Sequence, residues 1–468
     1  MPAPVTSGFV QPGNVLALFE RLDRRRNDTV LIADDAPITG RDLLEQADGW
    51  ERALAAAGVG PGELCAYTGD YDLATVSLLL ALMRIGAVAV PLTHGVSDQV
   101  LIGLDEAGTH WMISVDGAPH GRIVRRPPLP ENPIVQAFAK TGRPGLVVFT
   151  SGSSGRPKAI LHDLDRVLGK FVNGPQRRGW RTILFLLMDH FGGINTLFGT
   201  LTYGGIGICV PDRSVRTICR AIEQHRAELL PTSPSFLNLM IASGTWAAHH
   251  LSSVALVTYG TEPMPDLTLN RARGIFPQAR FKQTYGMSEI GVVRSRSPDP
   301  TSLWLEIGGD GFETRVVDGV LHIRSASSMV GYLNAPSPID ADGWMNTGDL
   351  VEQRDGAFRF VGRVSDIVNV GGQKVFPAEV EAVLLQAPNV VDATVLGRRH
   401  PILGNMVVAR VSLAGSEPAA ADRLREHCHK HLAKFKVPMR FEFVDIAEQV
   451  GQRAKKQRSW AVQGEGGA

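Results

Sequence analysis

The sequence predicts a layered α/β protein that carries a second, smaller α+β domain at its C-terminal end. Its 468 residues are too many for one ordinary domain. Short apolar runs alternate with helical segments over most of the chain, which is typical of layered α/β architecture. Near residue 363 this alternation gives way to a compact group of helices and strands. We therefore expect a large domain over residues 1–363 and a small one over residues 364–468.

The first third of the chain contains a well-marked helix. Thr39 is expected to cap it, with Asp42 three residues later. Apolar residues then recur at helical spacing, and Gly58 is placed to end the helix. The apolar positions are Leu43, Leu44, Ala47, Trp50 and Leu54.

Four apolar runs have the length and composition of buried parallel strands. They cover residues 88–92, 146–149, 206–210 and 254–259, and a helix is expected over 215–227. The C-terminal hundred residues predict helices over 379–386 and 420–434 and strands over 390–397, 406–413 and 441–445. Few large apolar residues occupy 362–366, so this segment suits a hinge.

Composition excludes several classes of function. Lysine and arginine number 48 against 47 acidic residues, which gives no reason to expect nucleic acid or an anionic membrane as a partner. The four cysteines form no CxxC pair, so a zinc ribbon or a disulfide framework is not expected. The most apolar window, 75–92, is interrupted by Arg84 and Gly86 and does not suit a membrane span. Because the first ten residues also lack a secretory pattern, we expect a cytoplasmic protein.

The most informative segment is a loop that follows the strand at 146–149. Its residues combine hydroxyls, glycines and a final lysine, which suit the binding of phosphate oxygens. They are Thr150, Ser151, Gly152, Ser153, Ser154, Gly155, Arg156, Pro157 and Lys158. The spacing is not that of the P-loop NTPases, and Pro157 would interfere with a helix that starts at the lysine. The segment therefore predicts a phosphate-binding loop of another kind.

Four further segments carry polar groups in turns: 284–289, 346–350, 362–372 with its continuation to 381, and 454–458. Together with the phosphate loop, and in this order, they resemble the ANL superfamily of adenylate-forming enzymes, which includes the acyl- and aryl-CoA synthetases. The resemblance covers nearly the whole chain. It implies a large N-terminal domain and a small mobile C-terminal one. It also implies that a carboxylate and ATP form acyl-AMP and pyrophosphate, after which a nucleophile displaces AMP.

The resemblance assigns the nucleotide-binding residues. The loop from Thr150 to Lys158 would hold the β- and γ-phosphates, and Glu289 would bind Mg²⁺, a hard cation that suits a carboxylate. Tyr285 would stack on adenine, Asp349 would accept hydrogen bonds from the ribose hydroxyls, and Arg363 would be a second ribose contact. Further residues expected around the nucleotide are Gly260, Thr261, Glu262, Thr284, Gly286 and Ser288.

The resemblance also implies a domain rotation between the two half-reactions. Asp366 would be the pivot, and Gly371 and Gly372 would face the acceptor tunnel, where missing side chains leave room for a pantetheine arm. Lys455 would be the adenylation lysine. Here the chain departs from the family pattern because a proline is missing and Ala454 replaces a glycine. Lys456 is therefore a competitor, and a solvated basic tail is the structural alternative.

The segment around His190 resembles acyl-CoA synthetases, in which a histidine is followed by two glycines. Amino-acid-activating relatives place an aspartate near Phe191, and phenylalanine cannot pair with an ammonium in that way. Asp189, two residues before Phe191, leaves that alternative partly open. His190 is expected at the mouth of the acid pocket, with a core histidine as the alternative. The residues expected to contact the acid are His190, Phe191, Gly192, Ile194, Tyr259, Gly260, Met287 and Ile290.

The apolar members of that group suggest an aromatic or medium aliphatic acid. ATP, Mg²⁺ and CoA are the expected cofactors and cosubstrates, which makes the protein an acid–CoA ligase. A carrier-protein phosphopantetheine or an amine could replace CoA as the acceptor. A luciferase-like oxygenase and a degenerate nucleotide-binding module are the competing classes. His427 and His431 stand at i, i+4 spacing, which can chelate a metal, but a solvated helix face is the expected role.

Overall fold

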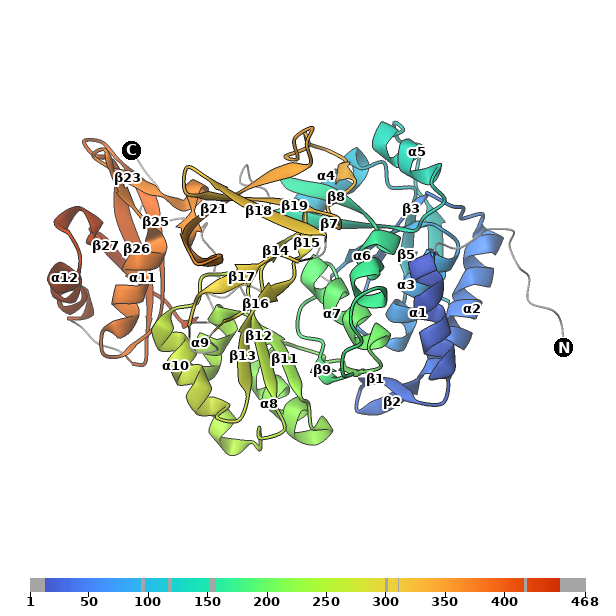
Figure 1. The fold of residues 1–468 in the computed structure, drawn as a ribbon, viewed down its shortest axis with the longest axis horizontal. Helices are drawn as coiled ribbons and strands as arrows, with labels where there is room; N and C mark the ends of the chain where they lie inside the picture. Colours follow the sequence, from blue (N-terminus) through green and yellow to red (C-terminus); the bar gives the residue numbers. More distant parts are fainter. Residues whose placement is uncertain are drawn as a thin grey trace.

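The computed structural model describes residues 13–93, 97–116, 120–151, 156–298, 302–309, 311–415 and 419–446. It has a large mixed α/β N-terminal domain and a small C-terminal domain, which lies at one end of the long axis of the molecule (Figure 1). No helix among these residues is long and apolar enough to cross a membrane.

Two seven-stranded sheets organise the large domain. The first has the order β20-β8-β7-β4-β3-β5-β6, and its central strands are parallel. The bounds of its strands are β3 Leu64–Thr68, β4 Val88–Leu92, β5 Trp111–Ser114, β6 Arg122–Arg125, β7 Gly145–Ser151, β8 Pro157–Asp163 and β20 Gly331–Tyr332. The predicted strands at 88–92 and 146–149 are thus confirmed as β4 and the body of β7.

The second sheet has the order β13-β12-β11-β9-β10-β1-β2, and all its pairs except β1–β2 are parallel. Its strands are β1 Thr29–Ala33, β2 Ala36–Thr39, β9 Arg181–Ile183, β10 Ile206–Ile208, β11 Leu229–Thr232, β12 Leu256–Tyr259 and β13 Arg280–Gln283. The runs predicted at 206–210 and 254–259 are confirmed as β10 and β12, each shorter by two residues.

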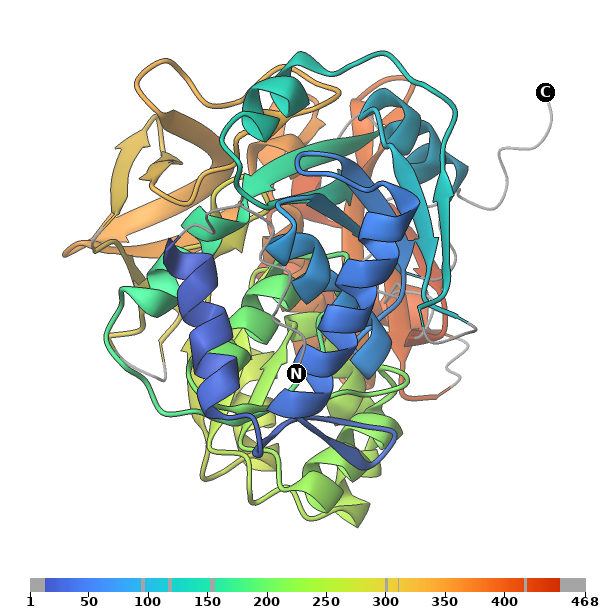
Figure 2. The same ribbon diagram turned by 90° about the vertical axis from the view of Figure 1, so that its right-hand side faces the viewer.

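Helices separate and cover the two sheets. They are α1 Gly13–Arg24, α2 Gly40–Ala57, α3 Leu73–Arg84, α4 Asp98–Glu106, α5 Pro133–Ala139, α6 Leu164–Val172, α7 Phe191–Thr202, α8 Val215–His225, α9 Pro234–Ser243 and α10 Asp266–Ile275, with the short η1 Thr245–Ala248. Figure 2 shows α1 and α2, drawn in blue, on the outside of the large domain. Helix α8 ends two residues before the predicted 227, because Arg226 adopts a left-handed conformation with φ 49°.

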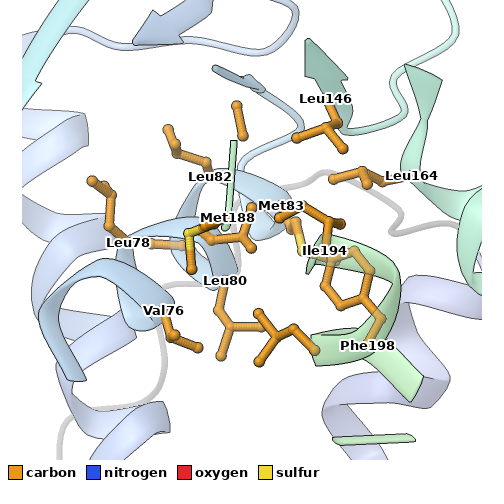
Figure 3. Packing of buried hydrophobic residues seen from close by; sticks show 14 of the residues in the cluster. Val76, Leu78, Leu80, Leu82, Met83, Leu146, Leu164, Met188, Ile194 and Phe198 are labelled. Carbon is orange, nitrogen blue, oxygen red and sulfur yellow. The ribbon is translucent and has the colours of Figure 1, made fainter. Parts of the chain in front are cut away.

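Helix α3 is buried on all sides, which its continuous apolar sequence requires. Its residues contact α7 and the first sheet at once, as Figure 3 shows for Leu80, Ile194, Phe198 and Leu146. Helix α2 begins as predicted. The Thr39 hydroxyl accepts a hydrogen bond from the Asp42 amide at 3.2 Å, and the Thr39 amide donates to the Asp42 carboxylate at 2.7 Å.

A six-stranded antiparallel sheet completes the large domain, with the order β16-β17-β22-β21-β19-β18. Its strands are β16 Ser295–Arg296, β17 Leu305–Ile307, β18 Phe312–Val317, β19 Val320–Ser325, β21 Trp344–Arg354 and β22 Ala357–Arg363. A short hairpin of β14 Gly286–Met287 and β15 Gly291–Val292 lies beside it. The small domain follows directly after β22.

The small domain contains η2 Val364–Asp366, β23 Val368–Val370, β24 Gln373–Val375, α11 Pro377–Gln386, β25 Val390–His400, β26 Gly404–Leu413, α12 Ala420–His431, η3 Lys434–Lys436 and β27 Arg440–Phe443. Each helix and strand predicted here is present, with bounds shifted by a few residues. Val380, Leu384, Val395 and Leu424 are among the residues that form a hydrophobic core within the domain. The small domain therefore packs around its own core, as a separate folding unit does.

A buried polar contact joins the two domains. The Asn238 side-chain amide on α9 donates to an Asp392 carboxylate oxygen on β25 at 3.2 Å. The amide oxygen of Asn238 accepts from the Thr268 hydroxyl on α10 at 2.7 Å. All three side chains are buried. In this arrangement the small domain is therefore seated on α9 and α10.

Candidate active site

The ends of β12 and β13, the β7–β8 hairpin, the β14–β15 hairpin and strands β21 and β22 carry most of the predicted site residues. The β7–β8 hairpin brings Thr150 opposite Lys158 and Ser151 opposite Pro157. Gly152, Ser153, Ser154 and Gly155 lie outside the described residues. Both ends of the predicted phosphate loop therefore lie side by side, at the end of the hairpin where β7 is connected to β8.

Lys158 and Glu289 converge on a residue that sequence reasoning missed. The Tyr332 hydroxyl donates to Glu289 Oε1 at 2.6 Å, and Lys158 Nζ lies 4.8 Å from the centroid of the Tyr332 ring. Strand β20 holds Tyr332 beside β8, opposite Ile160. Burial, together with the hydrogen bond and charge of Glu289, raises the pKa of Tyr332. The same tyrosine thus contacts both a cation and a carboxylate. The prediction assigns the cation to phosphate and the carboxylate to Mg²⁺.

Tyr285, Asp349 and Arg363 also meet. The Tyr285 hydroxyl donates to Asp349 Oδ2 at 2.6 Å, and Arg363 Nε donates to Asp349 Oδ1 at 2.8 Å. Asp349 and Arg363 are cross-strand partners in β21 and β22, so sheet register brings them together. Burial and the charge of Asp349 raise the pKa of Tyr285 well above its usual range. A carboxylate that is only 6% exposed is therefore held by two donors.

Phe360 is a second residue that sequence reasoning missed. Its ring stacks on that of Tyr285 with centroids 4.6 Å apart and an interplanar angle of 17°. One face of the tyrosine is thereby covered. In this arrangement, an adenine that stacks on Tyr285 must use the opposite face of the ring.

The segment at the end of β12 is packed closely against the end of β13. A Cβ atom on Gly260 would lie 2.6 Å from the Thr284 hydroxyl oxygen, so glycine is required there. Thr261 has φ 71°, and Glu262 Oε2 accepts from the Ser235 hydroxyl at 2.6 Å at the start of α9. The structure thus gives Glu262 a helix-capping role, and its predicted nucleotide contact stays a prediction.

The residues predicted around the acid occupy different environments. His190 caps α7, since its Nδ1 accepts from the Gly192 amide at 3.1 Å. Phe191 and Ile194 are buried in the core between the sheets, and Ile290 is buried in the core of the antiparallel sheet. Tyr259 lies in a third apolar cluster, and burial raises its pKa to about 12. Met287 stays partly exposed. The apolar wall that the sequence suggests is therefore mostly core, and its contact with an acid stays a prediction.

His162 on β8 is a further residue that the sequence did not single out. It is fully buried, and its ring lies 4.5 Å from that of Phe191. Among the described residues, neither ring nitrogen has a hydrogen-bond partner of normal geometry, although the Ser288 backbone is near enough to favour the charged form. Burial nevertheless lowers the pKa of His162 from 6.5 to about 4. The histidine is therefore neutral near pH 7, on the strand of the hairpin that contacts the first turn of α7.

We expect His162 to make the protein sensitive to acid. Its pKa is lower in the folded state than in the unfolded state, so unfolding takes up a proton below pH 6.5. Stability should fall as the pH drops from about 6.5 to about 4, by about 3 kcal/mol from this group. Urea unfolding of the wild type and of His162→Leu between pH 7.5 and 4.5 measures this loss of stability. A variant that loses stability as steeply as the wild type would contradict this assignment.

The hinge and tunnel residues lie at the start of the small domain. Asp366 ends η2, and one of its carboxylate oxygens accepts from the Ser365 hydroxyl at 3.0 Å. Gly371 and Gly372 form the exposed two-residue turn of the β23–β24 hairpin, with φ 54° and 84°. This turn requires left-handed residues, which suits two glycines. Lys455 and Lys456 lie outside the described residues.

Metal ligands are sparse. Within the described residues, no group of three or more histidine, cysteine, aspartate or glutamate side chains could hold a metal ion. His427 and His431 have ring centroids 4.7 Å apart, and His427 Nε2 lies 3.0 Å from the Val383 carbonyl oxygen. A magnesium ion at Glu289 would therefore take its other ligands from phosphate oxygens and water.

Comparison with known families accounts for these features together. The family described as AMP-binding enzyme matches residues 18–333, and the AMP-binding enzyme C-terminal domain matches residues 379–451. The chain belongs to the AMP-binding enzyme family. The predicted ANL superfamily and fold class are thus confirmed, and this protein is an AMP-forming ligase. As an AMP-binding enzyme it uses ATP and a small-molecule acid.

Relatives of this AMP-binding enzyme act on carboxylic acids. It is 29% identical to 3-[(3aS,4S,7aS)-7a-methyl-1,5-dioxo-octahydro-1H-inden-4-yl]propanoyl:CoA ligase of Mycobacterium tuberculosis, over 92% of this chain and 95% of the relative. It is 25% identical to 2-succinylbenzoate–CoA ligase of Bacillus subtilis, over 92% and 93%. An amide bond synthetase from Marinactinospora thermotolerans shares the fold, with a TM-score of 0.77 over 95% and 98% of the chains at 22% identity. The fold alone therefore does not fix the acceptor.

Proposed function

We propose that this AMP-binding enzyme activates an aromatic or medium aliphatic carboxylic acid and transfers its acyl group to the thiol of CoA. The convergence of Lys158 and Glu289 on Tyr332 carries the proposal, because it places a cation and a carboxylate beside the predicted phosphate loop. The two relatives named above are both CoA ligases, and their acids contain rings.

In the first step, a carboxylate oxygen of the acid attacks the α-phosphorus of ATP, and the bond to the β-phosphate breaks. Acyl-AMP and pyrophosphate result. Because both reactants are anions, the enzyme must mostly position them and neutralise charge. Lys158 would offset charge on the departing pyrophosphate. Asp349 and Arg363, already joined at 2.8 Å, would fix the ribose.

Glu289 is the residue that would hold Mg²⁺. Its carboxylate is partly exposed, is oriented by the Tyr332 hydroxyl, and is of the hard oxygen type that Mg²⁺ prefers. The bound ion would neutralise phosphate charge. Thr150, across the hairpin from Lys158, would add a hydroxyl on the phosphate side.

In the second step, the CoA sulfur attacks the acyl carbon, the bond to AMP breaks, and the thiol proton leaves to solvent. The small domain would turn about Asp366 and bring Gly371 and Gly372 to the acceptor. The buried contact between Asn238 and Asp392 would have to break during this rotation. The two half-reactions would therefore compete for the position of one domain.

Glu289→Gln is expected to reduce acyl-AMP formation by about 10²–10³-fold, because it removes a charge at the phosphates. The amide oxygen can still accept from Tyr332, so thermal stability should change little. Steady-state pyrophosphate release at several Mg²⁺ concentrations measures the effect. Glu352→Gln, at an exposed position on the neighbouring sheet, is the matched control. Equal rates for both variants would contradict the assignment of Glu289.

Product identification tests the proposed acceptor. The purified protein is incubated with ATP, Mg²⁺ and a panel of aryl and aliphatic acids, and then with CoA, a phosphopantetheine carrier protein or an amine, and the products are weighed by mass spectrometry. We expect acyl-CoA. If the main product is an acylated carrier protein or an amide, the acceptor is the carrier-protein thiol or the amine and not CoA. Oxygen uptake or light emission would indicate an oxygenase instead.

A further inference from the structure

A half-buried lysine behind the predicted acid site has no role in the chemistry described above. Lys170 lies near the end of α6, and its ammonium donates to the Asn195 side-chain oxygen and to the Val292 carbonyl at 3.1 Å. It also lies 4.9 Å from the centroid of the Phe171 ring. Within the described residues its hydrogen-bond partners are neutral.

Lys170 joins the three elements on which the acid site is predicted. Asn195 lies one helical turn after Phe191 on α7, and α6 and β15 both contact α7. Val292 on β15 is paired with Gly286, at the base of the hairpin that carries Met287. A ligand that enters between α7 and this hairpin would reach Lys170 at its far end.

The face of α7 on this side is not filled by large side chains. The residues of α7 that retain some exposure recur at helical spacing and are small or polar: Gly192, Asn195, Thr196 and Gly199. The remaining positions of the helix are buried. Asn195 accepts a hydrogen bond from Lys170 and belongs to this partly exposed face of α7. Because solvent reaches the face, a ligand can reach it too.

Among the residues that the structure describes, no carboxylate forms an ion pair with Lys170. Burial and, to a lesser degree, the positive charge of Arg177 lower the pKa of Lys170 to about 7. His162 lies near enough that Lys170 lowers its pKa in turn. The Arg294 guanidinium approaches the end of α6, 3.2 Å from the Cβ position of Gly174. Basic groups thus gather at this end of the site, and an anion would be stabilised there.

We propose that Lys170 binds a second carboxylate at the far end of the acid, so that the substrate is a dicarboxylic acid. The inference rests on the proposed function and names the substrate class for that same site. A carboxylate beside the ammonium would supply the opposite charge that the described residues do not provide, and a charge-assisted hydrogen bond would form. An acid with an apolar end would leave the ammonium with neutral partners alone. Lys170 is thus a specificity-determining residue.

The test compares each diacid with a matched monoacid in ATP–pyrophosphate exchange. Suberate is paired with octanoate, and 3-(4-carboxyphenyl)propanoate is paired with 3-phenylpropanoate. A further comparison uses 3-(4-carbamoylphenyl)propanoate, in which an uncharged amide replaces the ring carboxylate. We expect kcat/KM at least 10-fold higher for the diacid of each pair. Lys170→Gln should lower kcat/KM for the diacid by about 10–100-fold and change that for the monoacid less than twofold. Lys140→Gln, on the exposed end of α5, is the control and should change neither.

Each outcome has a separate meaning. If Lys170 only ties α6 to α7 and β15, Lys170→Gln lowers both members of a pair equally, and the inference is overturned. Equal use of diacid and monoacid by the wild type overturns it as well, while the proposed function stands. If no acid of any kind supports exchange, the proposed function itself fails. Thermal unfolding of Lys170→Gln and of Lys170→Met identifies a variant that has merely lost its fold.

Discussion

Asp349→Ala is expected to reduce kcat/KM for ATP by about 10²–10³-fold, the range seen when a preorganised polar group is removed from an active site. The carboxylate is held between Tyr285 at 2.6 Å and Arg363 at 2.8 Å. Its loss would remove the predicted ribose contact and leave the tyrosine hydroxyl without its acceptor. Steady-state kinetics at varied ATP, with saturating acid, measures the effect.

The same substitution should lower stability by about 1–3 kcal/mol, because the buried Tyr285 hydroxyl loses its acceptor. Asp349→Asn separates the two effects, since its amide oxygen can still accept one of the hydrogen bonds. Glu352→Ala, at an exposed position of β21, is the matched control and should leave both quantities unchanged. Full activity of a folded Asp349→Ala protein would exclude a nucleotide role for Asp349.

Lys455→Ala is expected to reduce acyl-AMP formation by about 10²–10³-fold and to spare acyl transfer from preformed acyl-AMP. The resemblance makes this lysine the adenylation lysine, which acts in the first half-reaction. Single-turnover formation of acyl-AMP, and thioester formation from synthetic acyl-AMP, measure the two steps separately. Lys456→Ala is the neighbouring control. Loss of the first step at Lys456 with tolerance at Lys455 would transfer the role to Lys456.

The Asn238–Asp392 contact between the domains affects which of the two half-reactions the enzyme is positioned for. Because Asp392 is fully buried against Asn238, any rotation of the small domain must expose a carboxylate and an amide that are paired in this arrangement. Water can solvate both groups once they separate, so the contact can hold one orientation without blocking the other. The arrangement thus has the properties of a two-position interface.

Local patterns in the sequence predicted local structure well. The capping residues Thr39 and Asp42 and the terminal Gly58 describe α2 correctly, since caps depend on residues within one turn. The pairing of Asp349 with Arg363 could also have been predicted, because the family resemblance assigns both residues to the ribose. These predictions need no knowledge of how distant parts of the chain pack.

The residues that were missed act through distant partners. Tyr332 lies 43 positions from Glu289, and nothing in its immediate neighbourhood indicates that contact. The His162 ring lies 4.5 Å from that of Phe191, and Lys170 donates to Val292, 122 positions away. Ile194 and Ile290 were assigned to the acid on apolar character alone. Apolar residues beside a site serve the core as readily as the ligand, and only the packing separates the two roles.

Acid-dependent exchange of labelled pyrophosphate into ATP is the measurement that tests the account most directly. The account predicts exchange that requires both Mg²⁺ and a carboxylic acid, proceeds without CoA, and falls at least 100-fold in Asp349→Ala and Glu289→Gln. Exchange that is absent with every acid, in a protein that is folded and binds ATP, would contradict the assignment of this site to acid activation.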